Sequence, residues 1–433
     1  MTVTYDPHHP KYLDESDVRD ELTRVFDLCH GCRLCFKFCS SFPTLFVFID
    51  RHDDQDAAKL TPAEQDQVAD ECFQCKLCYV NCPYTPGQHE WELDFPRLML
   101  RAQAMRHTNK DVPARRRVTD NVMGRTDLVG KVASGMATAT NAVTGKRGGL
   151  ARRVMAAAVG LSSQRLLPPF SRQRFTTWFK HRPRLRMEGR QAKVVLFPTC
   201  LVEYQSPAVG RDLVRVYERN GIECEVAYPG CCGAPYLHSG DIERFEKAAA
   251  ANVKALAAVA RDGTDIVVPQ PTCGYVLKKD YADYVPGPDA DAVAEHTYDA
   301  AEYLMKLHAA PGEGLDTTFE GDVPESVTYH APCHLRAQNI GLKSRDLMKL
   351  TGAKVTLVQQ CSGIDGLWGL REENADLSLA VSAKLGDQIG RVGGEVVAGD
   401  CHLANTAITE QTGRVPAHPI QVVARAYGIP EET

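Results

Sequence analysis

The sequence predicts a multi-domain α+β protein, in which a mostly helical N-terminal domain precedes two copies of an α/β unit built on a parallel sheet. Three observations predict this architecture. Two four-cysteine runs with identical spacing lie within residues 29–82. A strand–helix–strand–helix–strand pattern of about 100 residues occurs twice after residue 193. The stretch between these two parts is strongly basic.

The composition is typical of a soluble folded chain, except for its cysteines. Of the 433 residues, 44% are hydrophobic, 24% are charged and 16 are cysteine. The polar start, MTVTYDPHHPKYLDES, lacks the apolar core of a signal peptide, and no apolar run approaches the roughly 20 residues of a membrane span. We therefore expect a cytoplasmic protein, and in that compartment grouped cysteines indicate metal binding rather than disulfides.

Both cysteine runs follow the spacing C-x2-C-x2-C-x3-C, which is typical of bacterial ferredoxins with two [4Fe–4S] clusters. In such proteins the fourth cysteine of each run binds the cluster of the other run. Two zinc sites are the alternative, but zinc usually takes paired cysteines separated by a longer loop. The sequence therefore predicts one cluster held by Cys29, Cys32, Cys35 and Cys82, and a second held by Cys72, Cys75, Cys78 and Cys39.

The two runs define an expected ferredoxin-like domain at residues 1–100, which we expect to be mostly helical. Between the runs, the stretch TPAEQDQVADECFQC predicts a helix that starts at Thr61, with Pro62 as its first helical residue.

Residues 101–190 are expected to form a basic, partly amphipathic helical connector. Residues 101–193 carry 21 Lys and Arg but 4 Asp and Glu, whereas the whole chain has a net charge of −5. Phe175, Trp178 and Phe179 have the spacing of one helix face, with cations around them, which favours docking on an anionic membrane surface or on an acidic protein. The alternative is that this aromatic stripe packs on the neighbouring domain. Nucleic acid is not an expected partner, because no nucleic-acid module accompanies the charge.

The second half of the chain is an internal duplication, with a first repeat expected at residues 191–315 and a second at 320–433. The spacing from Cys200 to Cys231 is 31 residues, and that from Cys333 to Cys361 is 28. All but one of the cysteines follow predicted strands, and the carboxyl ends of parallel strands form the ligand-binding edge of a sheet. We therefore expect two convergent sets of metal-binding cysteines, Cys200, Cys231, Cys232 and Cys273 in the first repeat and Cys333, Cys361 and Cys401 in the second.

The remaining cysteine, Cys224, lies inside the predicted strand IECEVAY and is expected to be a core residue.

The repeats resemble the cysteine-rich CCG domains of heterodisulfide reductase subunits, of glycolate oxidase and lactate-utilisation iron–sulfur subunits, and of the C-type subunit of anaerobic glycerol-3-phosphate dehydrogenase. The resemblance rests on YPGCCGAPY, YHAPCHLRAQNIG, CSGIDGLWGLREEN and HPIQVVARAYG, together with the two ferredoxin motifs. The family pattern, C…CCG…CxxC, implies a cluster held by five thiolates. Here Gln270, Ser362 and Ala404 stand in place of family cysteines.

These departures leave different expectations for the two repeats. Four thiolates remain in the first repeat and suffice for an additional iron–sulfur cluster. Three remain in the second, where His334 or His402 could supply a fourth ligand and a scaffold without metal is the alternative.

The resemblance implies an iron–sulfur electron-transfer subunit that passes electrons from a partner flavin dehydrogenase, of the glycerol-3-phosphate dehydrogenase or glycolate/lactate oxidase type, to a quinone or another acceptor. The chain has no G-x-G-x-x-G after a strand, so we expect no flavin or NAD of its own. It would be a component of an oxidoreductase complex rather than a complete enzyme, and no residue is assigned as catalytic.

Two alternatives are reduction of a disulfide or quinone at the first CCG repeat, and a soluble electron donor to a non-haem iron oxidase or peroxidase. The expected location is the cytoplasm, with peripheral attachment to the inner face of the membrane as an extension of that prediction.

Overall fold

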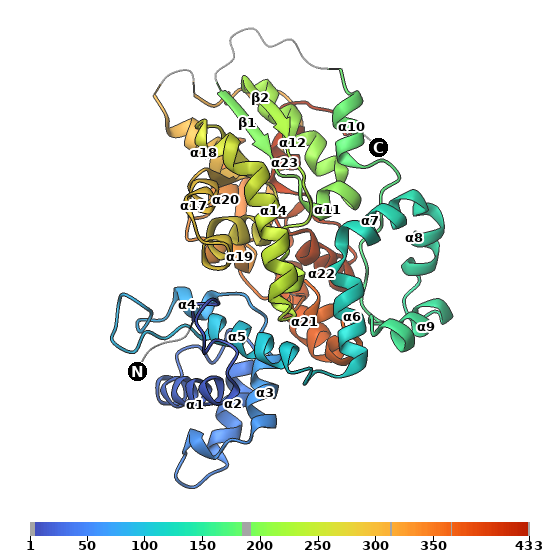
Figure 1. The fold of residues 1–433 in the computed structure, drawn as a ribbon. Helices are drawn as coiled ribbons and strands as arrows, with labels where there is room; N and C mark the ends of the chain where they lie inside the picture. The colour runs from blue at the N-terminus through green and yellow to red at the C-terminus, as the bar shows by residue number, and fades with distance from the viewer. Residues whose placement is uncertain (1–4, 184–191, 312–313, 365, 432–433) are drawn as a thin grey trace.

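The computed structural model in Figure 1 describes residues 5–183, 192–311, 314–364 and 366–431. It is rich in helices and contains two small parallel sheets, one in each repeat. The prediction of a duplicated α/β unit with a parallel sheet is therefore confirmed. No helix in the described ranges is both long and apolar enough to cross a membrane.

The N-terminal part, drawn in blue in Figure 1, is helical in the ranges described. Its elements are α1 (Glu15–Cys32), α2 (Ser41–Asp50), η1 (Ala57–Lys59), α3 (Pro62–Asp70), α4 (Leu77–Val80) and α5 (Phe95–Thr108). Their apolar faces share one core, in which Phe42 packs on Phe95 with ring centroids 4.6 Å apart.

Helix α3 begins where the sequence predicts. Thr61 and Glu64 cap its first turn reciprocally, and Pro62 is its first residue. The helix ends at Asp70 rather than running to the second cysteine motif, because the chain there turns through the left-handed residues Gln74 and Lys76.

The basic connector forms a group of short helices along one flank of the molecule (Figure 1). They are α6 (Ala114–Gly124), α7 (Thr126–Gly135), α8 (Ala137–Gly145), α9 (Leu150–Val159) and α10 (Phe175–His181).

The aromatic stripe of the connector lies on α10 and packs inward. Phe175 is completely buried in a core shared with α12 of the first repeat, and Trp178 and Phe179 pack against that core. The guanidinium of Arg182 covers the rings of both. The interpretation of this stripe as a membrane- or partner-docking face is therefore wrong, because the neighbouring domain supplies an apolar face that buries it.

The first repeat builds a four-stranded parallel sheet with the order β2-β1-β3-β4. Its elements are β1 (Ala192–Leu196), α11 (Thr199–Tyr204), α12 (Pro207–Arg219), β2 (Ile222–Val226), α13 (Ala234–His238), α14 (Ile242–Arg261), β3 (Asp265–Val268), α15 (Pro271–Tyr275), η2 (Val276–Asp280), α16 (Tyr281–Tyr284), α17 (Pro288–Glu295), β4 (Thr297–Asp299) and α18 (Ala300–Ala309). In register, Leu196 pairs with Val226 and with Val267. Cys224 lies in β2 and is buried in the core, as predicted.

The second repeat builds a three-stranded parallel sheet with the order β6-β5-β7. Its elements are β5 (Ser326–His330), α19 (Cys333–Ala337), α20 (Lys343–Leu350), β6 (Lys354–Val358), η3 (Trp368–Leu370), η4 (Glu372–Asn374), α21 (Ala375–Val392), β7 (Val396–Gly399), α22 (His402–Thr412) and α23 (Pro419–Ala426). The central strand is β5, and its last residue, His330, pairs with Val358 and Gly399. In both sheets the cysteines therefore follow the carboxyl ends of neighbouring strands.

Candidate functional site

The first predicted ligand set gathers at the end of α1. Burial raises the pKa of Cys29 well above its usual value, and the neighbouring thiols of Cys35, Cys82 and Cys32 raise it further. These four cysteines line a small cavity that Phe42 helps to close. Because Cys32 is exposed, this set lies at the surface of the molecule.

The second predicted set lies deeper in the chain. Cys72, Cys75 and Cys78 are buried, and burial together with the thiols of Cys75, Cys72 and Cys39 raises the pKa of Cys78. Cys35 of the first set also acts on Cys78, so the two sets are neighbours. The structure thus brings together the cysteines in the interlocked grouping that the spacing predicts.

The chemistry of these donors fits iron–sulfur clusters. Crowded, buried thiols resist ionisation, because desolvation and mutual repulsion disfavour several thiolates at one place. Iron cations would remove that penalty, since metal ligation deprotonates a thiol outright. Left-handed backbone at Arg33, Gln74 and Lys76 turns the chain between the cysteines of each run.

Within the described residues, no three His, Cys, Asp or Glu side chains converge closely enough to hold a single metal ion. In a cubane each thiolate binds a different iron atom, so its ligands surround a group of atoms rather than one ion.

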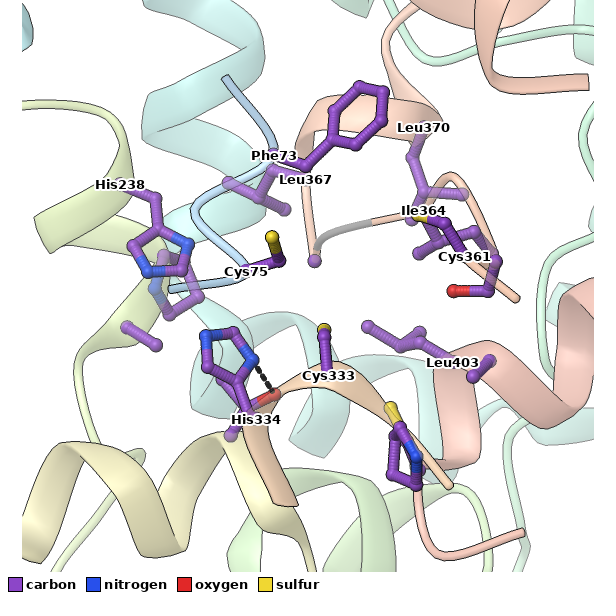
Figure 2. A pocket seen from close by; sticks show the side chains of 18 of the residues that line it. Phe73, Cys75, His238, Cys333, His334, Cys361, Ile364, Leu367, Leu370 and Leu403 are labelled. Atoms are coloured by element: carbon purple, nitrogen blue, oxygen red, sulfur yellow. Dashed lines mark hydrogen bonds between the residues drawn. The ribbon is translucent and has the colours of Figure 1, made fainter. Parts of the chain in front are cut away.

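One cavity of about 1200 Å³ connects the second ferredoxin motif with both repeats. Figure 2 shows Cys75, Cys333 and Cys361 around the same space, with Phe73, Leu367 and other apolar side chains between them. Helices α6 to α9 of the connector add apolar residues such as Val129 and Met155 to its wall. The cysteines that line it are Cys39, Cys75, Cys200, Cys231, Cys232, Cys273, Cys333, Cys361 and Cys401.

In the first repeat the four predicted thiols are in direct contact. The Sγ atoms of Cys232 and Cys273 are 3.3 Å apart. Hydrogen bonds from Cys200 and Cys232 lower the pKa of Cys231, and the same bonds raise the pKa of both donors. One thiolate supported by its neighbours is the arrangement that a shared metal centre would take over.

The glycine of the CCG motif allows the chain to turn beside these thiols. Gly233 has φ +89°, and a Cβ atom there would stand 2.8 Å from the Phe245 ring. Its amide donates to Cys231 Sγ over 3.5 Å. In the second repeat, Gly363 has φ +67° and its amide donates to Cys361 Sγ over 3.3 Å. The two loops thus have the same local geometry.

Asp127 is a site residue that the sequence analysis missed. This residue of α7 accepts hydrogen bonds from the Cys231 amide at 2.7 Å, from the Tyr228 hydroxyl at 2.6 Å and from the Tyr204 hydroxyl at 3.2 Å. It therefore places a carboxylate beside the CCG loop from a distant part of the chain. The signal that could have found it was its sign, because it is one of 4 acidic residues in the basic stretch 101–193.

Gln270 replaces the first cysteine of the family's CxxC in the first repeat. Its side chain is buried and lines the cavity, and its Oε1 accepts from the backbone amide of His402 at 3.1 Å. The residue therefore joins the two repeats.

In the second repeat, Cys333, Cys361 and Cys401 all line the cavity. Burial raises the pKa of Cys401 to about 11, and Cys273 of the first repeat is among the groups that act on it. The two cysteine sets are therefore adjacent.

The expectation that His334 could be a fourth ligand is wrong. Its Nε2 lies 3.0 Å from the Gln74 carbonyl and its Nδ1 lies 3.0 Å from the Thr272 hydroxyl, so both ring nitrogens are engaged. His334 instead joins the second ferredoxin motif, the first repeat and the second repeat. Trp368 supports the same junction, because its Nε1 donates to the Asp70 carbonyl at 2.6 Å.

Comparison with known proteins agrees with this geometry. The model of the cysteine-rich domain family, CCG, matches residues 194–278 and 327–407. The C-type subunit of anaerobic glycerol-3-phosphate dehydrogenase from Escherichia coli K12 is 28% identical over 400 residues, which cover 83% of this chain and 99% of that protein.

Two further relatives match shorter parts of the chain. The B-type subunit of the fumarate reductase (CoM/CoB) of Methanothermobacter marburgensis is 28% identical over 217 residues, covering 48% of this chain and 40% of that protein. Lactate utilization protein A of Shouchella clausii is 30% identical over 179 residues, covering 40% of this chain and 66% of that protein. With its two duplicated CCG domains, the chain belongs to the CCG-domain proteins, and it is similar over most of its length to the C-type subunit of anaerobic glycerol-3-phosphate dehydrogenase.

Proposed function

We propose that this protein is an iron–sulfur electron-transfer subunit, which passes electrons from the flavin of a partner dehydrogenase to a quinone or another acceptor. The observation that carries the proposal is the cavity in which cysteines of the second ferredoxin motif face those of both repeats. Relatives named as subunits of a dehydrogenase and of a reductase support a role inside such a complex. By this analogy, the partner is of the glycerol-3-phosphate dehydrogenase or glycolate/lactate oxidase type.

The ligand sets follow from the grouping of the thiols. Two [4Fe–4S] clusters would be held by the N-terminal domain (1–100), and a further cluster by Cys200, Cys231, Cys232 and Cys273 of the first repeat. Such clusters accept and release single electrons, with potentials set by burial and by hydrogen bonds to sulfur.

The protein's own residues order these sites. The exposed Cys32 places the first set where a partner can approach it, and the buried second set faces the cavity. His334 and Trp368 hold the second motif against the repeats.

The apolar wall of the cavity favours a quinone as acceptor. Leu403, Leu370 and Ile364 line it beside the cysteines, and the connector adds Met155 and Val129 (Figure 2). Such a lining suits a planar ring with a hydrocarbon tail, because burying apolar surface drives its binding. This observation also supports the second candidate function, direct reduction of an acceptor at the first CCG repeat. A polar disulfide fits the lining less well.

A test compares acceptors in the full-length protein. The protein is purified without oxygen, reduced with dithionite and mixed with a short-chain quinone or a water-soluble disulfide, while the visible absorbance is followed. We expect the quinone to reoxidise the protein faster than the disulfide does. Leu403→Trp, which fills the cavity, should slow the reaction with quinone, whereas Val415→Trp, at a site 80% exposed, should not. Equal rates in all three proteins would contradict a quinone site in the cavity.

Peripheral attachment to an anionic membrane is part of this proposal, with residues other than the aromatic stripe. Leu128, Val132 and Met136 are spaced four residues apart on and just after α7 and are each more than half exposed, as are Leu150 and Val154 on α9. Exposed apolar side chains on a strongly basic segment are what an interfacial helix needs.

Vesicle binding separates this version from a soluble donor to a non-haem iron oxidase or peroxidase. We expect the protein to co-sediment with vesicles that contain phosphatidylglycerol and to lose this binding in Val132→Glu/Leu150→Glu. Absence of binding by the unaltered protein would remove the membrane from the proposal.

A further inference from the structure

The two repeats differ at the residue three positions before their first cysteine. Phe197 precedes Cys200 in the first repeat, and His330 precedes Cys333 in the second. The first repeat keeps four cysteines, whereas the second has lost one thiol of its CCG motif to Ser362. A histidine therefore stands beside the incomplete set, and a phenylalanine beside the complete one.

The hydrogen bonds of His330 leave one ring nitrogen ready to bind a metal. Its Nε2 lies 3.0 Å from the Gln360 carbonyl, which can only accept, so Nε2 carries the proton. Nδ1 therefore carries the lone pair, and among the residues described here this buried atom has no partner. Burial lowers the pKa of His330 to about 4, which keeps the ring neutral at physiological pH.

This pattern is the one that metal-bound histidines show. A ligating histidine usually donates its other N–H to a carbonyl or carboxylate, which fixes the tautomer and the ring orientation. A buried ring nitrogen without a partner also carries a desolvation cost, which ligation would remove. His330 is 2% exposed and lines the cavity with Cys333, Cys361 and Cys401.

Other histidines fit the position less well. Both ring nitrogens of His334 are engaged. His402 also has a buried Nε2 without a partner in the described structure, but the histidines that line the cavity there are His238, His330 and His334.

We propose that the second repeat holds an iron–sulfur cluster with three thiolates, Cys333, Cys361 and Cys401, and with His330 Nδ1 as the fourth ligand. The inference rests on the proposed function to the extent that the chain carries clusters at all. A neutral imidazole in place of a thiolate removes one negative charge and raises the reduction potential of a cluster. The second repeat would then hold electrons more tightly than the first.

The test uses the full-length protein, purified without oxygen and labelled with ¹⁵N-histidine. Pulsed EPR on the reduced protein should show a histidine nitrogen coupled to one cluster. His330→Phe, which introduces the residue of the first repeat, should abolish that coupling and remove about four irons per chain, the content of one [4Fe–4S] cluster. His330→Cys should keep the iron and lose the coupling. His402→Ala is the matched control and should retain both.

Several results would overturn the inference. They are the absence of histidine coupling in the unaltered protein, coupling that persists in His330→Phe, coupling lost in His402→Ala alone, and zinc instead of iron at the second repeat. If His330→Phe fails to fold, the labelled unaltered protein and His330→Cys still decide. A chain with about eight or twelve irons and no coupling refutes this inference alone, whereas a chain without iron refutes the proposed function as well.

Discussion

The two CCG repeats share their strand order around a central strand, yet they present different chemistry at the same edge. In the first, four thiols are in contact and Asp127 supports the loop from outside the repeat. In the second, three cysteines and a buried histidine line the cavity. The comparison teaches that the parallel sheet fixes the place of a ligand and leaves its identity free, because any side chain at the end of a strand lies at the same edge.

The largest expected effect comes from removing the equivalent thiol of each CCG or CSG loop. Cys231→Ser should remove about four irons per chain, since a cubane needs four protein ligands. Cys361→Ser should do the same under the proposal of a histidine-completed cluster. Iron and acid-labile sulfide, counted after purification without oxygen, measure both variants.

These two variants can also break the comparison. If Cys361→Ser retains all the iron of the unaltered protein while Cys231→Ser loses its share, the second repeat is a scaffold. The repeats would then differ in occupancy and not only in ligand type.

The glycines of the two loops should differ in how strongly they resist substitution. A Cβ at Gly363 would stand 2.6 Å from the Ser378 carbonyl oxygen, which is backbone, whereas at Gly233 it would meet the Phe245 ring at 2.8 Å. Both positions have positive φ, so alanine is strained at either by about 1–3 kcal/mol. Gly363→Ala should add an overpacking cost of about 1–3 kcal/mol that Gly233→Ala partly avoids by a shift of the ring.

Urea unfolding of the anaerobic proteins compares the free energy of unfolding of the two glycine variants. A larger loss in Gly233→Ala than in Gly363→Ala would show that the loops are less alike than their geometry suggests.

The sequence predicts the parts of this architecture that depend on local pattern. Strand and helix order, the capped start of α3 at Thr61 and the grouping of the N-terminal cysteines all follow from spacing along the chain. The aromatic stripe of α10 was misinterpreted because periodicity reveals an apolar face but not what covers it. Asp127 and His330 were missed because their roles depend on contacts that the fold creates, across 104 residues to Cys231 in one case and through a carbonyl 30 residues away in the other.

A smaller effect is expected from Asp127, which has a role in the first repeat only. Asp127→Asn removes the charge that strengthens three hydrogen bonds at the CCG loop and should lower the free energy of unfolding by about 2 kcal/mol. Loss of a negative charge beside Cys231 should also make the potential of the first repeat's cluster more positive, while the second repeat's cluster keeps its potential. Potentiometric EPR titration measures both, with the exposed Asp111→Asn as control. An unchanged potential would reduce Asp127 to a structural role.

The smallest effect concerns pH and a buried carboxyl that distinguishes the repeats. Asp280 stands seven residues after Cys273, and the position seven residues after Ala404 holds Gln411, whose Nε2 donates to Ser382 at 2.8 Å. Burial raises the pKa of Asp280 to about 6, although Lys76 and Arg97 oppose the shift and Asp283 and Asp94 add to it. Its Oδ2 has no hydrogen-bond partner among the described residues.

The sign of the resulting pH dependence follows from proton binding. An unfolded aspartate titrates near 3.9, so between about pH 4 and 6 the folded chain retains a proton that the unfolded chain has released. The free energy of unfolding therefore falls as pH rises through that window, and the loss is complete above the folded pKa. Asp280→Asn, which leaves the first repeat uncharged here like the second, should flatten this slope. Urea midpoints between pH 5 and 8 measure it, and equal slopes in the variant and the unaltered protein would mean that Asp280 is ionised at neutral pH without cost to folding.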